Sequence, residues 1–168
     1  MVVIRPTRKL QKALPVTPTA GASDTALGDW YVNQLIVDRQ PLLLLVSAAS
    51  LLPALVRARN VRGLPTRIED IVTRRLKRLG IAASLIDAER PAMAPVQIGA
   101  TADRSVLGIL VDFAKGVPYC LEAGWDDAAL GVAEDRLAET PCHAGKTSDR
   151  VVFPEQKAPE LLLAKWAG

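Results

Sequence analysis

The sequence of 168 residues predicts an α+β protein, built on a small and mainly antiparallel sheet of four to five strands with helices packed to one side. Segments rich in β-branched and aromatic residues, typical of strands, lie mostly in the first third of the chain. Helical segments with apolar stripes are interleaved with them, without the strict alternation of a parallel α/β fold. A hydrophobic fraction of 49% over this length is enough for one core, so residues 1–168 are predicted to form a single domain.

The first strands are expected close to the N-terminus. Residues 1–5 predict a short strand, and Thr7 can open a short helix that follows it. Residues 30–37 and Leu42–Val46 predict a hairpin around a polar turn. The uninterrupted apolar run Leu42–Val46 indicates a strand buried on both faces.

The segment Leu51–Val56 allows two interpretations. Pro53 can place it on the edge of the sheet, because proline donates no ladder hydrogen bond, or can open a helix capped by Ser50. We favour the edge strand, which extends the hairpin into a meander. Residues 15–26 and 141–152, rich in proline, glycine and polar residues, are expected to be exposed loops.

The clearest helix is expected over residues 67–79, where apolar residues form one stripe. Thr66 and Glu69 have the spacing of a capping box, and Gly80 is a typical stop signal. The other expected elements are a helix over 82–90, a strand over 96–101, helices over 104–122 and 127–138 capped by Asp103 and Asp126, and a last helix opened by Pro159.

Charge is divided unequally along the chain. Residues 1–80 hold 13 Lys and Arg against 5 Asp and Glu, whereas residues 81–168 hold 8 against 13, so the halves carry net charges of +8 and −5. A basic face could meet an acidic partner, or the two halves could pair with each other. The predicted basic surface is Arg67, Arg74, Arg75, Lys77 and Arg78, within a wider set that includes Arg57, Arg59 and Arg62.

The chemistry of this basic set favours a protein partner over nucleic acid. Arginine binds anions through its two-pronged guanidinium group, which suits both kinds of partner. However, no aromatic residues are interleaved with these arginines to stack against bases, and no helix-turn-helix pattern is convincing. Positive residues at the end of a helix are also explained by the helix dipole.

Two short motifs carry a family resemblance. The segment Leu27–Asn33 reads LGDWYVN, and Asp103–Gly108 reads DRSVLG at the start of a predicted helix. With the first strand and its basic helix, they resemble an uncharacterised family of small bacterial proteins, a domain of unknown function with LGDWYAN-like and NRSVLG-like motifs. The resemblance covers about the first 120 residues, and Asp103 replaces an asparagine that would cap the helix equally well. It implies an α+β fold and a bacterial cytoplasmic setting, and no activity.

The same motifs contain the candidate binding residues. Asp29, Trp30 and Asn33 cluster at a strand start, where they could bind a polar group or could serve as turn and core residues. Arg104 and Ser105 lie at a helix N-terminus, which attracts phosphate or carboxylate groups, although an ordinary cap explains them as well. An enzyme with an anionic substrate would bring these residues to one pocket.

No metal site or cofactor is expected. Cys142 and His143 are adjacent, but neighbouring residues rarely face one ion, and zinc requires three or four ligands. Cys120 is the other cysteine, and two thiols in a chain of this size suit a reducing compartment. A thiol nucleophile would need an activating group that the sequence does not indicate.

These observations predict a non-enzymatic bacterial cytoplasmic protein that binds another macromolecule through its basic first half. The alternative is a small enzyme for a phosphorylated or other anionic substrate near Arg104. No membrane association is expected, because the longest uncharged stretch, residues 40–56, is too short to cross a bilayer, and no secretion signal is expected. The apolar residues Leu161–Leu163 make self-association through the C-terminal helix conceivable.

Overall fold

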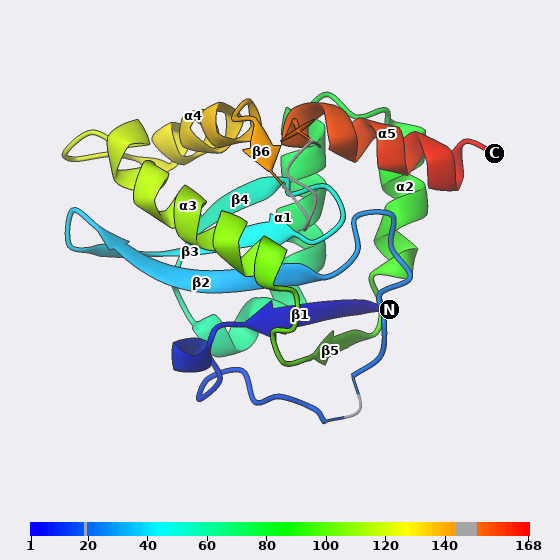
Figure 1. Ribbon diagram of the computed structural model, residues 1–168, viewed down its shortest axis with the longest axis horizontal. Helices are drawn as coiled ribbons and strands as arrows, with labels where there is room; N and C mark the ends of the chain where they lie inside the picture. Colours follow the sequence, from blue (N-terminus) through cyan, green and yellow to red (C-terminus); the bar gives the residue numbers. More distant parts are fainter. Residues whose placement is uncertain (19, 144–150) are drawn as a thin grey trace.

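The fold centres on one five-stranded sheet. The computed structural model describes residues 1–18, 20–143 and 151–168. The strand order is β4-β3-β2-β1-β5 (Figure 1). Strands β2, β3 and β4 form an antiparallel meander, while β1 is parallel to both β2 and β5. The strands are β1 (Val2–Pro6), β2 (Trp30–Val37), β3 (Gln40–Ser47), β4 (Pro53–Arg57) and β5 (Val96–Ile98).

Five helices surround this sheet, and the predicted α+β class is confirmed. They are α1 (Leu64–Arg78), α2 (Ala83–Ala92), α3 (Arg104–Cys120), α4 (Asp127–Ala138) and α5 (Pro154–Trp166), with the 3-10 turns η1 (Arg8–Leu10) and η2 (Val61–Gly63). Within the described part of the chain, none of the helices has both the length and the apolar character needed to cross a membrane.

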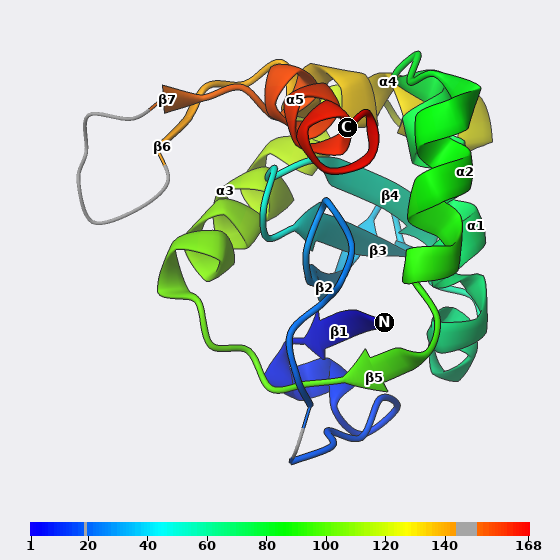
Figure 2. The ribbon, with the colours of Figure 1, turned by 90° about the vertical axis from the view of Figure 1, so that its right-hand side faces the viewer.

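Helices cover both faces of the sheet, which corrects the predicted packing to one side. Helices α1 and α2 lie on one face and α3 on the other (Figure 2). Leu43 and Leu45 belong to the core under α1, α2 and α5, whereas Leu42 and Leu44 belong to the core under α3 and α4. Successive side chains of a strand point to opposite faces, so a strand that is apolar throughout requires cover on both. The prediction that Leu42–Val46 is buried on both faces is confirmed.

The segment Leu51–Val56 contributes the edge strand β4, as favoured from the sequence. Pro53 is its first residue, opposite Val46 of β3. Helix α4 lies alongside the outer edge of this strand, where the buried Glu134 carboxylate accepts the backbone N–H of Leu55 at 2.8 Å. The side chain of Glu134, from a helix that is distant in the sequence, thus takes the place of a further strand over part of the edge.

Several predicted boundaries differ in the structure. Helix α1 begins at Leu64 and has Pro65 in its first turn, a position that suits proline. Thr66 therefore lies inside the helix, and the predicted capping box does not form. The hydroxyl of Thr66 instead donates to the carbonyl of Gly63 at 2.8 Å. Helix α5 begins at Pro154 rather than Pro159, because the four residues between the prolines are good helix formers.

The two predicted loops have different outcomes. Residues 15–26 are irregular and mostly exposed where the structure describes them. In the segment 141–152, β6 (Cys142–His143) pairs with β7 (Val151–Val152) as a small antiparallel sheet. The predicted loop between these strands, residues 144–150, lies outside the described residues.

Candidate functional site

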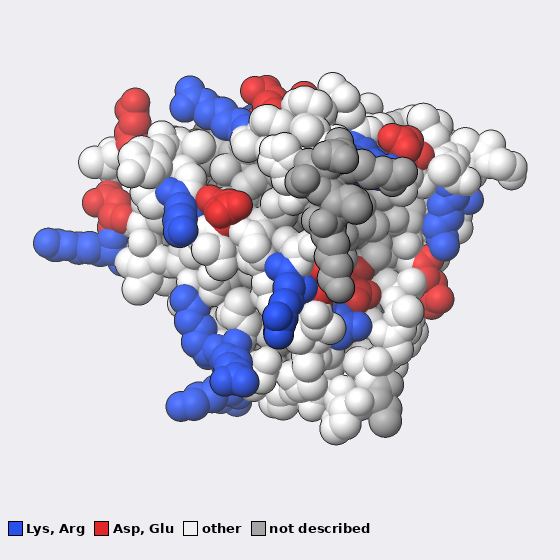
Figure 3. Space-filling model, viewed as in Figure 1, with Lys and Arg blue, Asp and Glu red and all other residues white. Residues whose placement is uncertain are grey.

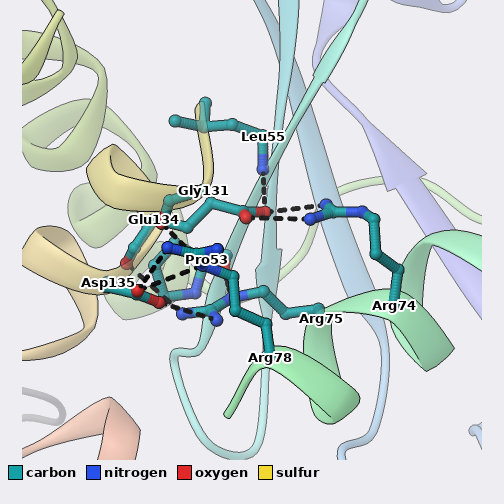
Figure 4. A network of polar contacts seen from close by, with 8 residues as sticks. All are labelled: Pro53, Leu55, Arg74, Arg75, Arg78, Gly131, Glu134 and Asp135. Carbon is teal, nitrogen blue, oxygen red and sulfur yellow. Dashed lines mark hydrogen bonds and ion pairs between the residues drawn. The ribbon is translucent and has the colours of Figure 1, made fainter. Parts of the chain in front are cut away.

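The predicted basic surface separates into two groups with different surroundings. Its members Arg67, Arg74, Arg75, Lys77 and Arg78 all lie on α1. Three of them reach toward α4, where they meet acidic residues from the second half of the chain (Figure 4). Lys77 is exposed, and Arg67 lines a pocket beside β4 that Arg74 also lines.

Glu134 of α4 is the centre of the first group. Its side chain is 0% exposed, and Arg74 donates to its two oxygens at 3.0 and 2.9 Å while Leu55 N–H donates from β4. The hydrogen bonds from Arg74 to Glu134 raise the pKa of Arg74 above its ordinary value. A buried carboxylate is tolerated here because it accepts three hydrogen bonds and faces a positive charge.

Arg75 is completely buried, so the structure corrects its assignment to a basic surface. Its Nε donates to the carbonyl of Pro53 at 2.7 Å, and its Nη1 contacts Asp135 at 3.2 Å. Burial lowers the pKa of Arg75, because removing the charge from water costs free energy that Glu134 and Asp135 offset only in part. Arg78 also pairs with Asp135, at 2.9 Å. The positive charge of Arg74, Arg75 and Arg78 is therefore used to join the two halves of the chain.

The second group of arginines lines a pocket of about 310 Å³ between the outer edge of β4, α1 and the start of α4. We call it the arginine pocket. Its lining consists of Arg57, Arg59, Arg67, Arg74 and Asp127, with the apolar residues Leu55, Val56 and Leu130. Its volume is at the lower end of the range typical of ligand pockets.

Arg57 is held rigidly at one side of the arginine pocket. Its Nε donates to Asp127 at 2.6 Å, its Nη1 donates to Gln40, and its guanidinium lies 4.6 Å from the ring centroid of Trp125. The hydrogen bond and charge of Arg57 hold the pKa of Asp127 below its ordinary value. Asp127 is therefore ionised at neutral pH, and its carboxylate is a weak proton acceptor.

Arg59 and Arg67 meet no carboxylate among the ion pairs of the described residues. Arg67 Nη2 donates to the carbonyls of Arg59 and Asn60, at 2.8 and 3.0 Å, which orient the guanidinium without neutralising it. Its Nε is buried without a hydrogen-bond partner. Arg59 is exposed. The arginine pocket therefore retains positive charge that the protein itself does not compensate.

The predicted binding residues of the first motif, Asp29, Trp30 and Asn33, make contacts within the protein itself. Asp29 accepts hydrogen bonds from Arg5 of β1 and from Ser23, and thereby ties the 15–26 segment to the sheet. Trp30 is 1% exposed in the core. Asn33 accepts from Thr7 at 3.2 Å. The Asp29 carboxylate and the side-chain oxygen of Asn33 are thus hydrogen-bonded within the fold, and Trp30 is a core residue.

The second motif is joined directly to the first. Asp103 caps α3, as predicted, by accepting the backbone N–H groups of Ser105 and Val106 at 2.9 and 3.3 Å. The backbone N–H of Asp103 in turn donates at 2.9 Å to the hydroxyl of Tyr31 in the first motif. The cap uses N–H groups that an anion at this helix end would need.

The five predicted binding residues are not brought together in one described pocket. Ser105 lines a small pocket of about 230 Å³ beside Asp103 and Val106, whose lining does not include Asp29, Asn33 or Arg104. This placement does not favour the arrangement expected for an enzyme with an anionic substrate near Arg104.

A further set of positive side chains lies on the face that carries α3. Lys and Arg gather there near η1, which contains Arg8 and Lys9, while positive and negative side chains are mixed elsewhere on this face (Figure 3). Lys9 lines a neighbouring pocket whose other residues are mainly apolar. The arginine pocket differs from this set in having four arginines in the lining of one cavity.

Cys142 and His143 line a pocket of about 240 Å³ that also includes Asp112. Burial raises the pKa of the Cys142 thiol to about 11, and the charge of Asp112 acts in the same direction. The thiol is therefore protonated at neutral pH, unlike an activated nucleophile. Among the described residues, no three His, Cys, Asp or Glu side chains are grouped to hold a metal ion.

Iodoacetamide at pH 8 is expected to label the half-buried Cys120 before the buried Cys142. Labelling of Cys142 should accelerate up to about pH 11, since the thiolate is the reactive form. Because the folded-state pKa is raised, the stability due to this thiol is complete below the ordinary pKa of a thiol and is lost as the pH rises from there through the folded-state pKa of about 11. Peptide mapping by mass spectrometry measures both rates; equal labelling at pH 8 would contradict the expectation.

The sequence indicated Arg67 and Arg74 as basic surface residues. It did not indicate the acidic and aromatic side chains that the arginines of this region contact. Glu134, Asp127 and Trp125 carry no local signal for these contacts, because they lie some 60 residues or more from the arginines that they meet.

Comparisons with known proteins place the chain in a family without indicating an activity. No curated protein and no solved structure matches it significantly. The model of a family described as "Domain of unknown function (DUF6933)" matches residues 3–157, which is nearly the whole chain and extends beyond the segment that carried the resemblance. The chain therefore belongs to the DUF6933 family of domains of unknown function.

Proposed function

We propose that this protein is a non-enzymatic binding protein that holds an acidic segment of a partner protein in the arginine pocket. The observation that carries the proposal is the pair Arg59 and Arg67, which line the pocket and meet no carboxylate among the described ion pairs. Guanidinium groups bind carboxylates with directed, charge-assisted hydrogen bonds.

The surroundings of these arginines support a protein partner rather than a nucleic acid. Leu55, Val56 and Leu130 give the pocket an apolar wall that aliphatic side chains can contact. The pocket lining, as formed by the described residues, includes no aromatic residue, and Trp125, whose ring lies against the guanidinium of Arg57, is 5% exposed. A base would therefore have no ring to stack against, and stacking is the main sequence-tolerant contact in single-strand binding.

The lining also supports binding without catalysis. Asp127 is the acidic residue of the pocket lining, and its pKa is lowered by Arg57. A general base works best with a pKa near the operating pH, so a carboxylate held in this ion pair is a poor one.

Co-purification with matched charge variants tests the proposal. Tagged protein is isolated from its own host, and companions are quantified by mass spectrometry for the wild type, Arg59→Glu and Lys77→Glu. Both positions are exposed, but only Arg59 lines the arginine pocket. We expect a stoichiometric protein companion that raised salt releases, that Arg59→Glu loses and that Lys77→Glu retains. Equal recovery with both variants, or recovery of nucleic acid instead, would contradict the proposal.

A further inference from the structure

The charges around the arginine pocket do not balance. Four of the residues that line it are arginines. Arg57 is paired with Asp127, whose carboxylate lies 2.6 Å from its Nε. Arg74 is paired with Glu134 at 2.9 Å. The other two arginines of the lining form no ion pair among the described residues, so two positive charges in one cavity of about 310 Å³ have no counter-charge there.

These two arginines, Arg59 and Arg67, have donor groups that the described residues do not use. Arg67 donates through Nη2 to the carbonyls of Arg59 and Asn60, while its Nη1 and its buried Nε have no partner in the described part of the chain. Arg59 is exposed, and its guanidinium donates to none of the described acceptors. The carbonyl contacts fix the guanidinium of Arg67 before a ligand arrives, which lowers the entropy lost on binding.

We infer that the acidic group held in the arginine pocket is a phosphate monoester on a side chain of the partner segment, an inference that rests on the proposed function. A phosphorylated serine, threonine or tyrosine carries a charge of about −1.5 to −2 at neutral pH and presents three strong acceptor oxygens. A single carboxylate carries one negative charge and would leave part of the surplus uncompensated. A phosphate matches the two unpaired arginines in charge.

Two neighbouring carboxylates would bring the same total charge, but they fit the pocket less well. Like charges close together in one small cavity repel each other and favour protonation of one of them. A phosphate holds its charge on one group, and its oxygens can accept from two guanidinium forks at once. The contacts with the phosphate are therefore assigned to Arg59 and Arg67, while Arg57 and Arg74 stay in their ion pairs.

An NMR titration of the isotope-labelled full chain with three capped peptides tests this inference. The peptides are acetyl-Ala-phosphoserine-Ala-amide, acetyl-Ala-Glu-Ala-amide and acetyl-Ala-Glu-Glu-Ala-amide. We expect the phosphopeptide to shift the side-chain resonances of Arg59 and Arg67, and to bind about tenfold more tightly than either Glu peptide. A tenfold difference in affinity corresponds to one charge-assisted hydrogen bond.

Matched arginine variants locate the contact. Arg59→Gln should weaken binding of the phosphopeptide about tenfold, since it removes one of the two forks. Arg62 provides the control, because it is also exposed and lies on η2 but is not part of the pocket lining. Arg62→Gln should therefore change the affinity by less than about twofold. Both side chains are exposed, so circular dichroism should show the wild-type fold for both variants.

Several results would overturn the inference. They are equal affinity for the phosphopeptide and the peptide with two Glu, equal weakening by Arg59→Gln and Arg62→Gln, and no resonance shifts at millimolar phosphopeptide. Equal affinity for glycerol phosphate would overturn the assignment to a protein segment, because a free phosphorylated metabolite would then fill the pocket as well.

Phosphatase treatment separates this inference from the proposed function. The companion isolated with the tagged wild type is treated with a broad-specificity phosphatase, and we expect its release. A companion that stays bound after dephosphorylation but is lost with Arg59→Glu would overturn the phosphate assignment and leave the proposed function intact. A companion recovered equally with Arg59→Glu and Lys77→Glu would instead overturn the proposed function and, with it, the partner segment.

Discussion

Replacing Glu134 by alanine is expected to lower the free energy of unfolding by about 2–3 kcal/mol, mainly because a buried backbone N–H loses its acceptor, whereas the half-exposed Arg74 can be solvated. The carboxylate is 0% exposed and binds both Arg74 and the N–H of Leu55. Its loss leaves the N–H of an edge strand buried without an acceptor and frees the guanidinium of Arg74. The contact between α4 and β4 should weaken as a result.

Urea denaturation followed by circular dichroism measures this effect. Glu134→Gln retains one oxygen that can accept a hydrogen bond, so its loss of stability should be clearly smaller than that of Glu134→Ala. The matched control is Glu160→Ala, which removes an exposed ion pair with Lys157 and should cost at most about 1 kcal/mol. A cost for Glu134→Ala no larger than that of Glu160→Ala would contradict the role assigned to this carboxylate.

Arg75→Ala is expected to destabilise the protein by about 3 kcal/mol or more, because its removal leaves a cavity and unpaired carbonyls in the core. The side chain is 0% exposed and donates to the carbonyls of Pro53 and Glu134. Arg75→Met should cost less, since it keeps most of the buried volume while losing the hydrogen bonds. Asp135 retains its ion pair with Arg78 in both variants.

Lys77→Ala, two residues away on the exposed side of α1, is the control and should change the free energy of unfolding by less than about 0.5 kcal/mol. Thermal or urea unfolding of the three variants measures the difference. If Arg75→Ala proved as mild as Lys77→Ala, Arg75 would be a surface residue, as its place in a run of basic residues had suggested.

Elements specified by nearby residues could be predicted from the sequence. Asp103 and Asp126 cap α3 and α4, since a helix cap depends on residues two or three positions apart. The apolar run Leu42–Val46 predicted its own burial on both faces. A strand that is apolar throughout requires cover on both faces, so the predicted packing of the helices to one side was wrong.

Helix starts were less predictable where two local signals compete. Thr66 has the spacing of a cap, but Pro65 fits the first turn and α1 begins before it. Pro154 and Pro159 both suit a helix start, and the packing of Ala158 and Leu162, each 0% exposed, favours the longer helix. In both cases packing contacts add to local preferences that by themselves leave the first residue of the helix ambiguous.

The sequence by itself determined the α+β class, the family resemblance, the main caps and a basic first half. Only the tertiary structure decided which arginines are internal and which line a pocket. Arg75 and Arg78 are neutralised because α4 brings Asp135 beside them from about 60 residues away, whereas Arg59 and Arg67 form no ion pair among the described residues. The interaction energy of two charges depends on their separation in space, and separation along the chain does not reveal that distance.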